Sequence, residues 1–229
     1  QRVPGFGHKR EMLSGNFIGA HAHEPEFPWF KRPSRLANST QKAIVIGAGI
    51  SGCATAFSLA QRGWKVTLIE RNNEIAQEAS GNPQGILYIK PSAHNTALSQ
   101  LLLSGFGYTR RLLTHWPDSP YFDACGLLQL AFDGKELERQ QQLARHFDSS
   151  LLRALSSQEA SDLAGVDITT PALFYPESGW IRPSELCKAL IQHANIELLC
   201  GHEAKQLVYA RDEWEAHSEN ERIASAPVV

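Results

Sequence analysis

The chain of 229 residues is 42% hydrophobic and 20% charged, which are ordinary values for a globular protein with a buried core. Its 22 Lys and Arg against 24 Asp and Glu leave a formal net charge of −2, so it lacks the overall positive charge on which sequence-independent nucleic-acid binding depends. It contains neither an apolar run of about 18 residues nor the apolar core of a secretory signal, so we expect a cytoplasmic protein without membrane contact.

The cysteines and the N-terminal histidines give no metal-binding pattern. Cys53, Cys125, Cys187 and Cys200 form no CxxC motif, and no histidine lies at zinc-ligand spacing beside them. His21 and His23 form a pair that lacks a third ligand. We therefore expect reduced, mostly buried thiols and no metal site.

The first 40 residues differ in composition from the rest of the chain. Residues 1–18 combine Pro and Gly with a basic cluster and are interpreted as the end of a preceding domain. Residues 19–40 hold three prolines and no apolar periodicity, which is typical of a linker. The chain does not begin with Met, and residues 221–229 resemble the start of another buried strand. We therefore expect a piece of a longer protein, in which residues 41–229 begin a domain that is incomplete here.

A βαβ unit is predicted directly after the linker. Residues 42–47 are a short apolar run rich in β-branched residues, as in a buried parallel strand. Residues 50–63 have a helical pattern with Gly63 as the stop signal, and residues 65–70 form a second apolar run. Two parallel strands joined by a helix are expected to cross over in the right-handed sense. The predicted class is α/β with a Rossmann-like fold.

The turn between the first strand and the helix carries a GxGxxG pattern. Gly47 permits the tight turn, Gly49 lets a diphosphate approach the backbone, and Gly52 allows close packing of helix and strand. The free amides and positive dipole end of the helix favour an anion at this point. Glu70 ends the second strand, where its carboxylate can accept hydrogen bonds from both ribose hydroxyls and would repel a 2′-phosphate. These features predict a dinucleotide site without NADP specificity.

The segment after Glu70 favours FAD over NAD. A plain NAD-binding domain would continue with another helix and strand, whereas residues 71–90 are polar and rich in glycine. Their backbone amides and side chains can wrap the diphosphate or ribityl chain of an extended FAD, although an ordinary surface turn has the same composition. The predicted cofactor-binding residues are Gly47, Ala48, Gly49, Ile50, Ser51, Gly52, Glu70, Arg71, Ser80, Gly81, Asn82, Gln84 and Gly85.

The later segments do not continue the βαβ pattern. Helices are predicted at 95–116, 134–155, 156–165 and 183–194, and strands at 126–132, 172–183, 196–200, 205–210 and 213–218. Ser156 and Glu159 have the spacing of a capping box, with Gly165 as the stop. We expect a helical and antiparallel insertion within the FAD-binding domain, after which residues 196–200 return to the parallel sheet. Residues 205–210 and 213–218 are expected to form a hairpin.

Several longer stretches resemble one flavoenzyme family. Residues 47–71 and 74–113, with the block SGNPQG followed by ILY as the more specific part, resemble the FAD domain of the bifunctional bacterial tRNA 5-methylaminomethyl-2-thiouridine biosynthesis proteins. These belong to the wider group of D-amino-acid-oxidase-like and glycine-oxidase-like flavoenzymes. The sequences PGFGHKREML and PWFKRP resemble the end of the methyltransferase domain and the interdomain linker of the same proteins. The resemblance implies an incomplete D-amino-acid-oxidase-like fold.

The resemblance also implies a reaction. The flavin domain is expected to remove, by FAD-dependent oxidation, the carboxymethyl group of 5-carboxymethylaminomethyl-(2-thio)uridine at the tRNA wobble position. A fused methyltransferase domain then methylates the resulting amine with S-adenosylmethionine. The implied partners are tRNA and that domain, and no catalytic residue is assigned. Two alternatives stay open, a glycine-oxidase-like oxidase of small amines and a non-catalytic nucleotide-binding piece.

Overall fold

The computed structural model describes residues 2–4, 11–13, 41–94, 96–116 and 120–229. The chain divides into two units, Gln1–Ser39 and Thr40–Val229, and each is described by itself. In the first unit, β1 (Arg2–Pro4) and β2 (Glu11–Leu13) pair in antiparallel orientation. The remainder of the predicted methyltransferase segment, the linker and its two histidines lie outside the described residues, so the predicted domain boundaries stay predictions.

The second unit contains a three-stranded parallel sheet. Its strands follow the order β11 (Ile196–Leu199), β4 (Lys65–Ile69) and β3 (Lys42–Ile46). The helix α1 (Ile50–Ala60) connects β3 to β4, which confirms the predicted βαβ unit. The return of residues 196–200 to this sheet is also confirmed, because β11 pairs with β4 along its whole length.

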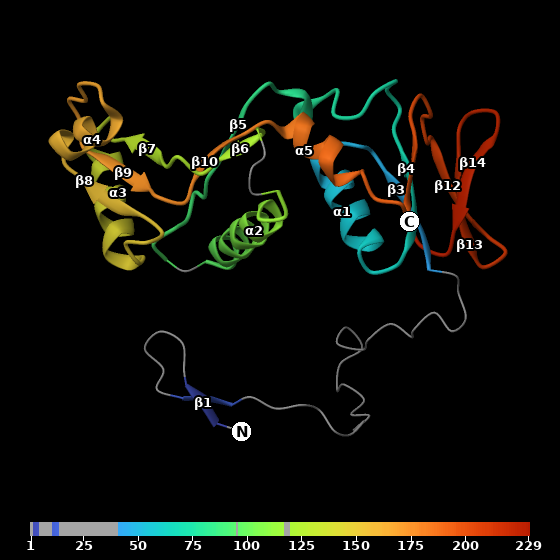
Figure 1. Ribbon diagram of the computed structural model, residues 1–229, viewed down its shortest axis with the longest axis horizontal. Helices are drawn as coiled ribbons and strands as arrows, with labels where there is room; N and C mark the ends of the chain where they lie inside the picture. Colours follow the sequence, from blue (N-terminus) through green and yellow to red (C-terminus); the bar gives the residue numbers. More distant parts are fainter. Residues whose placement is uncertain (1, 5–10, 14–40, 95, 117–119) are drawn as a thin grey trace. The chain divides into compact units, whose positions relative to one another are not determined.

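Two helices cover one face of the parallel sheet (Figure 1). The buried residues of α1 are Cys53, Ala56, Phe57 and Ala60, whose spacing places them on one side of the helix. The helix α5 (Pro183–Leu190) packs against α1 and buries Leu186, Cys187 and Leu190 in the same core. All four cysteines are free; Cys53 and Cys187 are buried as expected, whereas Cys125 is exposed and Cys200 is half-buried.

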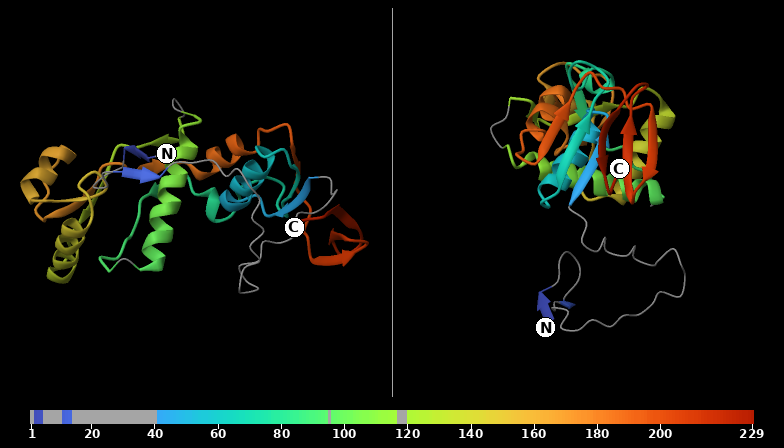
Figure 2. Two further views of the ribbon diagram at one scale, coloured as in Figure 1. Left: turned by 90° about the horizontal axis from the view of Figure 1, so that it is seen from below. Right: turned by 90° about the vertical axis from the view of Figure 1, so that its right-hand side faces the viewer.

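An antiparallel sheet covers the other face. It consists of β12 (Gln206–Ala210), β13 (Glu213–His217) and β14 (Arg222–Ala226), and Figure 2 (right) looks onto this layer. Ala216 and Ala226 pack against Ile44 and Ile69 of the parallel sheet. Alternate residues of β3 and β4 thus face the helices and the antiparallel sheet. The predicted hairpin of residues 205–210 and 213–218 is confirmed.

The predicted insertion is also confirmed and contains two small antiparallel sheets. The first is ordered β5 (Gly85–Leu87), β10 (Gly179–Ile181) and β6 (Phe122–Asp123). The second is ordered β7 (Leu127–Leu130), β9 (Ala172–Tyr175) and β8 (Arg153–Leu155). Its helices are α2 (Ala97–Leu113), α3 (Gly134–His146) and α4 (Ser157–Ala164). The Ser156–Glu159 capping box is present as predicted, and Gly165 ends the helix as predicted, in the left-handed conformation.

Three predictions differ most from the structure in their boundaries. The strand predicted at 172–183 is two strands, β9 and β10, which belong to different sheets, and Pro183 begins α5. The helix predicted at 134–155 ends at His146, because Phe147 has an extended backbone and residues 153–155 form β8 at a sheet edge. The segment 221–229, predicted as the start of one buried strand, has two parts. Its first part is β14, which belongs to the antiparallel sheet, and only Val228 pairs with Ala43 in parallel orientation.

Within the described part of the chain, no helix has both the length and the apolar character required to cross a membrane.

Candidate functional site

The glycine turn between β3 and α1 depends on close contact between backbone atoms. Gly47 has a φ of +92°, a conformation that glycine adopts without strain, and its N–H donates to the carbonyl of Ile69 at 2.7 Å. A Cβ at Gly52 would lie 3.0 Å from the carbonyl carbon of Gly47 and closer still to its oxygen. The absence of a side chain at Gly52 therefore lets the first turn of α1 lie directly on the turn that precedes it.

Glu70 is a buried carboxylate at the carboxyl end of β4, with only 7% of its surface exposed. Its Oε2 accepts a hydrogen bond from the N–H of Ala48 at 2.7 Å. Its Oε1 accepts two more, from the backbone N–H and the side-chain amide of Asn72, at 2.9 and 2.8 Å. A buried charge needs such donors to offset the loss of hydration. Glu70 thus joins the end of the second strand to the glycine turn.

The loop after Glu70 returns to the N-terminus of α1. The N–H of Ala76 donates to the carbonyl of Ala48 at 3.1 Å, so the loop is fixed to the glycine turn. The short 3₁₀ helix η2 (Ala79–Gly81) follows and places Ser80 beside Gly49. The hydroxyl oxygen of Ser80 accepts a hydrogen bond from the N–H of Ile50 at 2.9 Å, and no side chain caps the helix at Gly49.

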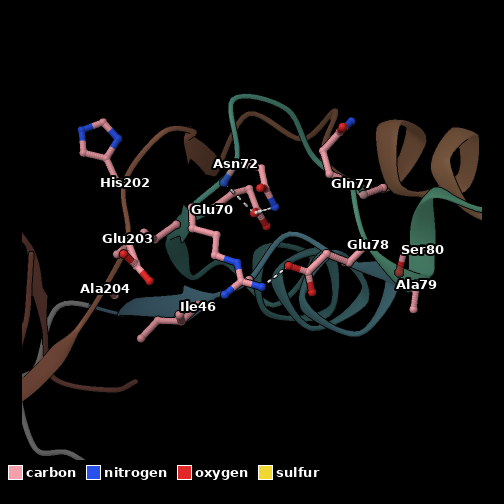
Figure 3. A pocket seen from close by; sticks show the side chains of 15 residues that line it. Ile46, Glu70, Asn72, Gln77, Glu78, Ala79, Ser80, His202, Glu203 and Ala204 are labelled. Carbon is pink, nitrogen blue, oxygen red and sulfur yellow. Dashed lines mark hydrogen bonds and ion pairs between the residues drawn. The ribbon is translucent and has the colours of Figure 1, made fainter.

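These elements enclose an open cavity of roughly 410 Å³ (Figure 3). Figure 3 shows Glu78 and Ser80 at one end, His202 and Glu203 at the other, and Glu70 between them. The residues that line the cavity are Ile46, Gly47, Gly49, Ile69, Glu70, Arg71, Asn72, Ala76, Gln77, Glu78, Ala79, Ser80, His202, Glu203 and Ala204. The carboxyl ends of β3, β4 and β11 meet here, which is where open α/β sheets bind their ligands.

The far wall of the cavity is formed by residues 202–204, which were not predicted from the sequence. His202 is held there by two hydrogen bonds: its N–H donates to the carbonyl of Glu70 at 2.9 Å, and its Nδ1 lies 2.8 Å from the carbonyl of Cys200. A signal for this wall existed, because residues 196–200 were expected to join the parallel sheet. The residues after that strand must then lie at the same edge as Glu70.

Five of the thirteen predicted cofactor residues line the cavity, namely Gly47, Gly49, Glu70, Arg71 and Ser80. Four others support it from beneath or beside: Ala48 is fully buried, and Ile50, Ser51 and Gly52 form the first turn of α1.

The remaining four predicted residues do not line the cavity. Gly81 lies against the backbone of Ala76, and the side-chain amide of Asn82 donates to the carbonyl of Ala79 at 3.1 Å. Gln84 is exposed, and Gly85 lies in β5.

The fold is a Rossmann-like α/β domain interrupted by an antiparallel insertion, with a cavity at the carboxyl ends of its parallel strands. Residues 42–229 match the family described as FAD dependent oxidoreductase (DAO). The chain therefore belongs to the family of FAD-dependent oxidoreductases.

Curated relatives are similar over the whole chain. The chain is 54% identical over 233 residues to the tRNA 5-methylaminomethyl-2-thiouridine biosynthesis bifunctional protein MnmC of Pseudomonas syringae pv. tomato. It is 53% identical over 229 residues to the protein of the same name from Pseudomonas aeruginosa. Each alignment covers 100% of this chain and 35% of the relative, so the chain spans about a third of the length of these proteins.

Solved structures of flavoenzymes share the fold. Glycine oxidase from Bacillus cereus superposes with a TM-score of 0.65 at 21% identity, over 82% of this chain and 55% of that one. L-Proline dehydrogenase from P. horikoshii superposes with a TM-score of 0.64 at 20% identity, over 83% of this chain and 52% of that one. At these identities the likeness concerns the fold alone, and it confirms the predicted fold class.

Proposed function

We propose that the cavity at the N-terminus of α1 binds the adenosine diphosphate part of FAD. The observation that carries the proposal is the meeting of three features in one cavity: the start of α1, the glycine at position 49, and the buried Glu70. The first turn of a helix has N–H groups without intrahelical partners and a positive dipole end, which favour a diphosphate.

Ser80 extends the donor set of the helix. Because its oxygen already accepts the N–H of Ile50, its own hydroxyl hydrogen is free to be donated. The hydroxyl lies above Gly49, where a diphosphate would approach the backbone. Ser80 can therefore donate a hydrogen bond to the anion while its oxygen accepts the N–H of Ile50.

Glu70 would hold the ribose through its remaining acceptor capacity. A carboxylate offers about four lone-pair positions, and three are used by Ala48 and Asn72. One position on Oε2 is left for a ribose hydroxyl, so a second ribose hydrogen bond would require Asn72 to move. The other predicted cofactor residues, including Gly81, Asn82, Gln84 and Gly85, are retained in the proposal as the segment that leads away from the diphosphate.

We further propose that this domain serves the oxidative removal of the carboxymethyl group from 5-carboxymethylaminomethyl-(2-thio)uridine in tRNA, in the cytoplasm. The names of the relatives, which concern biosynthesis of the methylaminomethyl nucleoside, support this substrate. Bound FAD would supply the capacity to accept a hydride from the carbon next to the amine nitrogen. The residues described above bind and orient the cofactor, and a fused S-adenosylmethionine-dependent methyltransferase domain would complete the modification.

Two measurements test the proposal. The purified chain should bind FAD and ADP, and FMN, which lacks the adenosine part, should bind far more weakly. Cells in which the gene encoding this chain carries Gly49→Val should accumulate the carboxymethylaminomethyl nucleoside in their tRNA, as measured by mass spectrometry of digested nucleosides. A normal nucleoside profile in cells that make the variant at normal levels would contradict the tRNA substrate. Turnover of glycine instead of tRNA would favour the alternative amine oxidase.

A further inference from the structure

The cavity that we propose receives a diphosphate is lined by more acidic than basic side chains. Three carboxylates line it, from Glu70, Glu78 and Glu203, and Arg71 is the one Lys or Arg side chain among its described lining residues. Glu203 is partly neutralised by Lys205, which lies 3.6 Å away and also pairs with Glu219. A diphosphate entering the cavity must therefore obtain its counter-charge from Arg71 and from the start of α1.

Arg71 is already engaged by a carboxylate on the opposite side of the cavity. Its guanidinium forms an ion pair with Glu78, drawn as a dashed line in Figure 3. This hydrogen bond holds the pKa of Glu78 below its ordinary value and raises the pKa of Arg71. The backbone of Glu78 is held in this loop by the hydrogen bond that its carbonyl accepts from the N–H of Gly81 at 2.7 Å. The pair thus joins the end of β4 to the start of η2.

Glu78 stands two residues before Ser80 on the same segment. Ser80 accepts the first N–H of α1, and Glu78 accepts the guanidinium of Arg71. The segment 78–80 therefore occupies, with its own oxygen atoms, two donors that an incoming diphosphate could use, the N–H of Ile50 and the guanidinium of Arg71. The hydroxyl of Ser80 can donate onward to the diphosphate, whereas an ionised carboxylate cannot donate.

We propose that Glu78 competes with the dinucleotide diphosphate for Arg71 and thereby sets the affinity of this cavity. When the diphosphate binds, Arg71 exchanges the carboxylate of Glu78 for phosphate oxygens. Glu78 then stays beside the ligand as a negative charge without its ion-pair partner. This inference rests on the proposed function, because it takes the cavity to be the diphosphate site.

The test measures the dissociation constant of ADP for the full chain by calorimetry at low salt. Glu78→Gln should tighten ADP binding by about two- to fivefold, as expected for a solvent-exposed charge pair. This gain in ADP affinity should shrink above about 0.15 M salt, because dissolved ions then screen charges that are more than about 8 Å apart. Arg71→Gln should weaken binding by about tenfold, since a charge-assisted hydrogen bond is lost.

Two further variants separate competition from general repulsion. Glu74→Gln removes the same charge from the same loop but not from the cavity lining, and should leave the dissociation constant unchanged. In the Arg71→Gln background, Glu78→Gln should tighten binding less than it does when Arg71 is present. The side chains of Arg71 and Glu78 are both more than half exposed, so we do not expect their substitution to unfold the chain. Thermal melting of each variant checks this.

The outcomes distinguish this inference from the proposed function. Unchanged or weaker ADP binding by Glu78→Gln, or an equal gain with and without Arg71, would overturn the competition while leaving the nucleotide site in place. An equal gain from Glu74→Gln would overturn it as well. Absence of ADP binding to the natural chain and to every variant would overturn both proposals together.

Discussion

Replacing Gly52 by alanine tests whether the turn and the helix are packed as described. The new Cβ would lie 3.0 Å from the carbonyl carbon of Gly47, closer to its oxygen, and 3.6 Å from a methyl group of Val45. Ordinary van der Waals contact begins at 3.4 Å. The atoms that collide belong to the backbone, so no rotation of a side chain relieves the clash. Overpacking of this kind costs about 1–3 kcal/mol, and we expect the upper end of that range.

Urea unfolding followed by circular dichroism measures this change. The free energy of unfolding of Gly52→Ala should fall by about 3 kcal/mol, and ADP binding should be lost because the turn at Gly47 moves. Gly105→Ala is the matched control: Gly105 is an exposed position within α2, where an added Cβ meets nothing within 4 Å. It should stabilise the chain by about 0.5–1 kcal/mol. A Gly52→Ala variant as stable as the natural chain, with unchanged ADP affinity, would refute the packing argument.

Three further results are expected. Gly49→Val should abolish FAD retention, since its side chain would fill the approach to the α1 N-terminus; an unaltered flavin content would count against the diphosphate placement. Glu70→Ala should weaken FAD binding by about 1.5–3 kcal/mol, and also lower stability by freeing the N–H of Ala48; an unaltered dissociation constant would contradict its ribose role. The hydrogen bond from Arg139 holds the pKa of Glu136 below its usual 4.5, so the stability that this ionised carboxylate contributes is present above that pH and is lost as the pH falls through the lowered pKa. The difference in unfolding free energy between the natural chain and Glu136→Gln should therefore shrink on acidification. A difference that stays constant with pH would exclude this role of Glu136.

The sequence predicted the parts of the site that depend on neighbouring residues. The glycine spacing, the apolar runs on both sides and the acid at position 70 are local signals, and they located the turn, α1 and the end of β4 correctly. The wall formed by residues 202–204 was missed because it comes from a strand far along the chain, and its side chains carry no motif. The end of α3 at His146 was missed for a similar reason, since β8 is stabilised by its pairing with β9 and not by local sequence.

The hydrogen-bond partners inside the site also required the structure. The acidic character of Glu70 was evident, but only the structure shows that Asn72 and Ala48 already use most of its acceptor capacity. Glu78 lies in a loop whose composition is that of an ordinary turn, so its pairing with Arg71 could not be predicted from the pattern.

The pairing of β4 with β11 has a consequence for how the domain folds. The two strands are neighbours in the sheet but are separated by well over one hundred residues of chain, because the whole insertion lies between them. The length of this loop adds little to the free-energy cost of bringing the two strands together, because each doubling of loop length adds only about 0.6 kcal/mol. Contacts of such long range do slow folding, however. The glycine turn and Glu70 are built from residues close together in the chain, whereas His202 and Glu203 reach their places only when β11 pairs with β4 across the whole insertion.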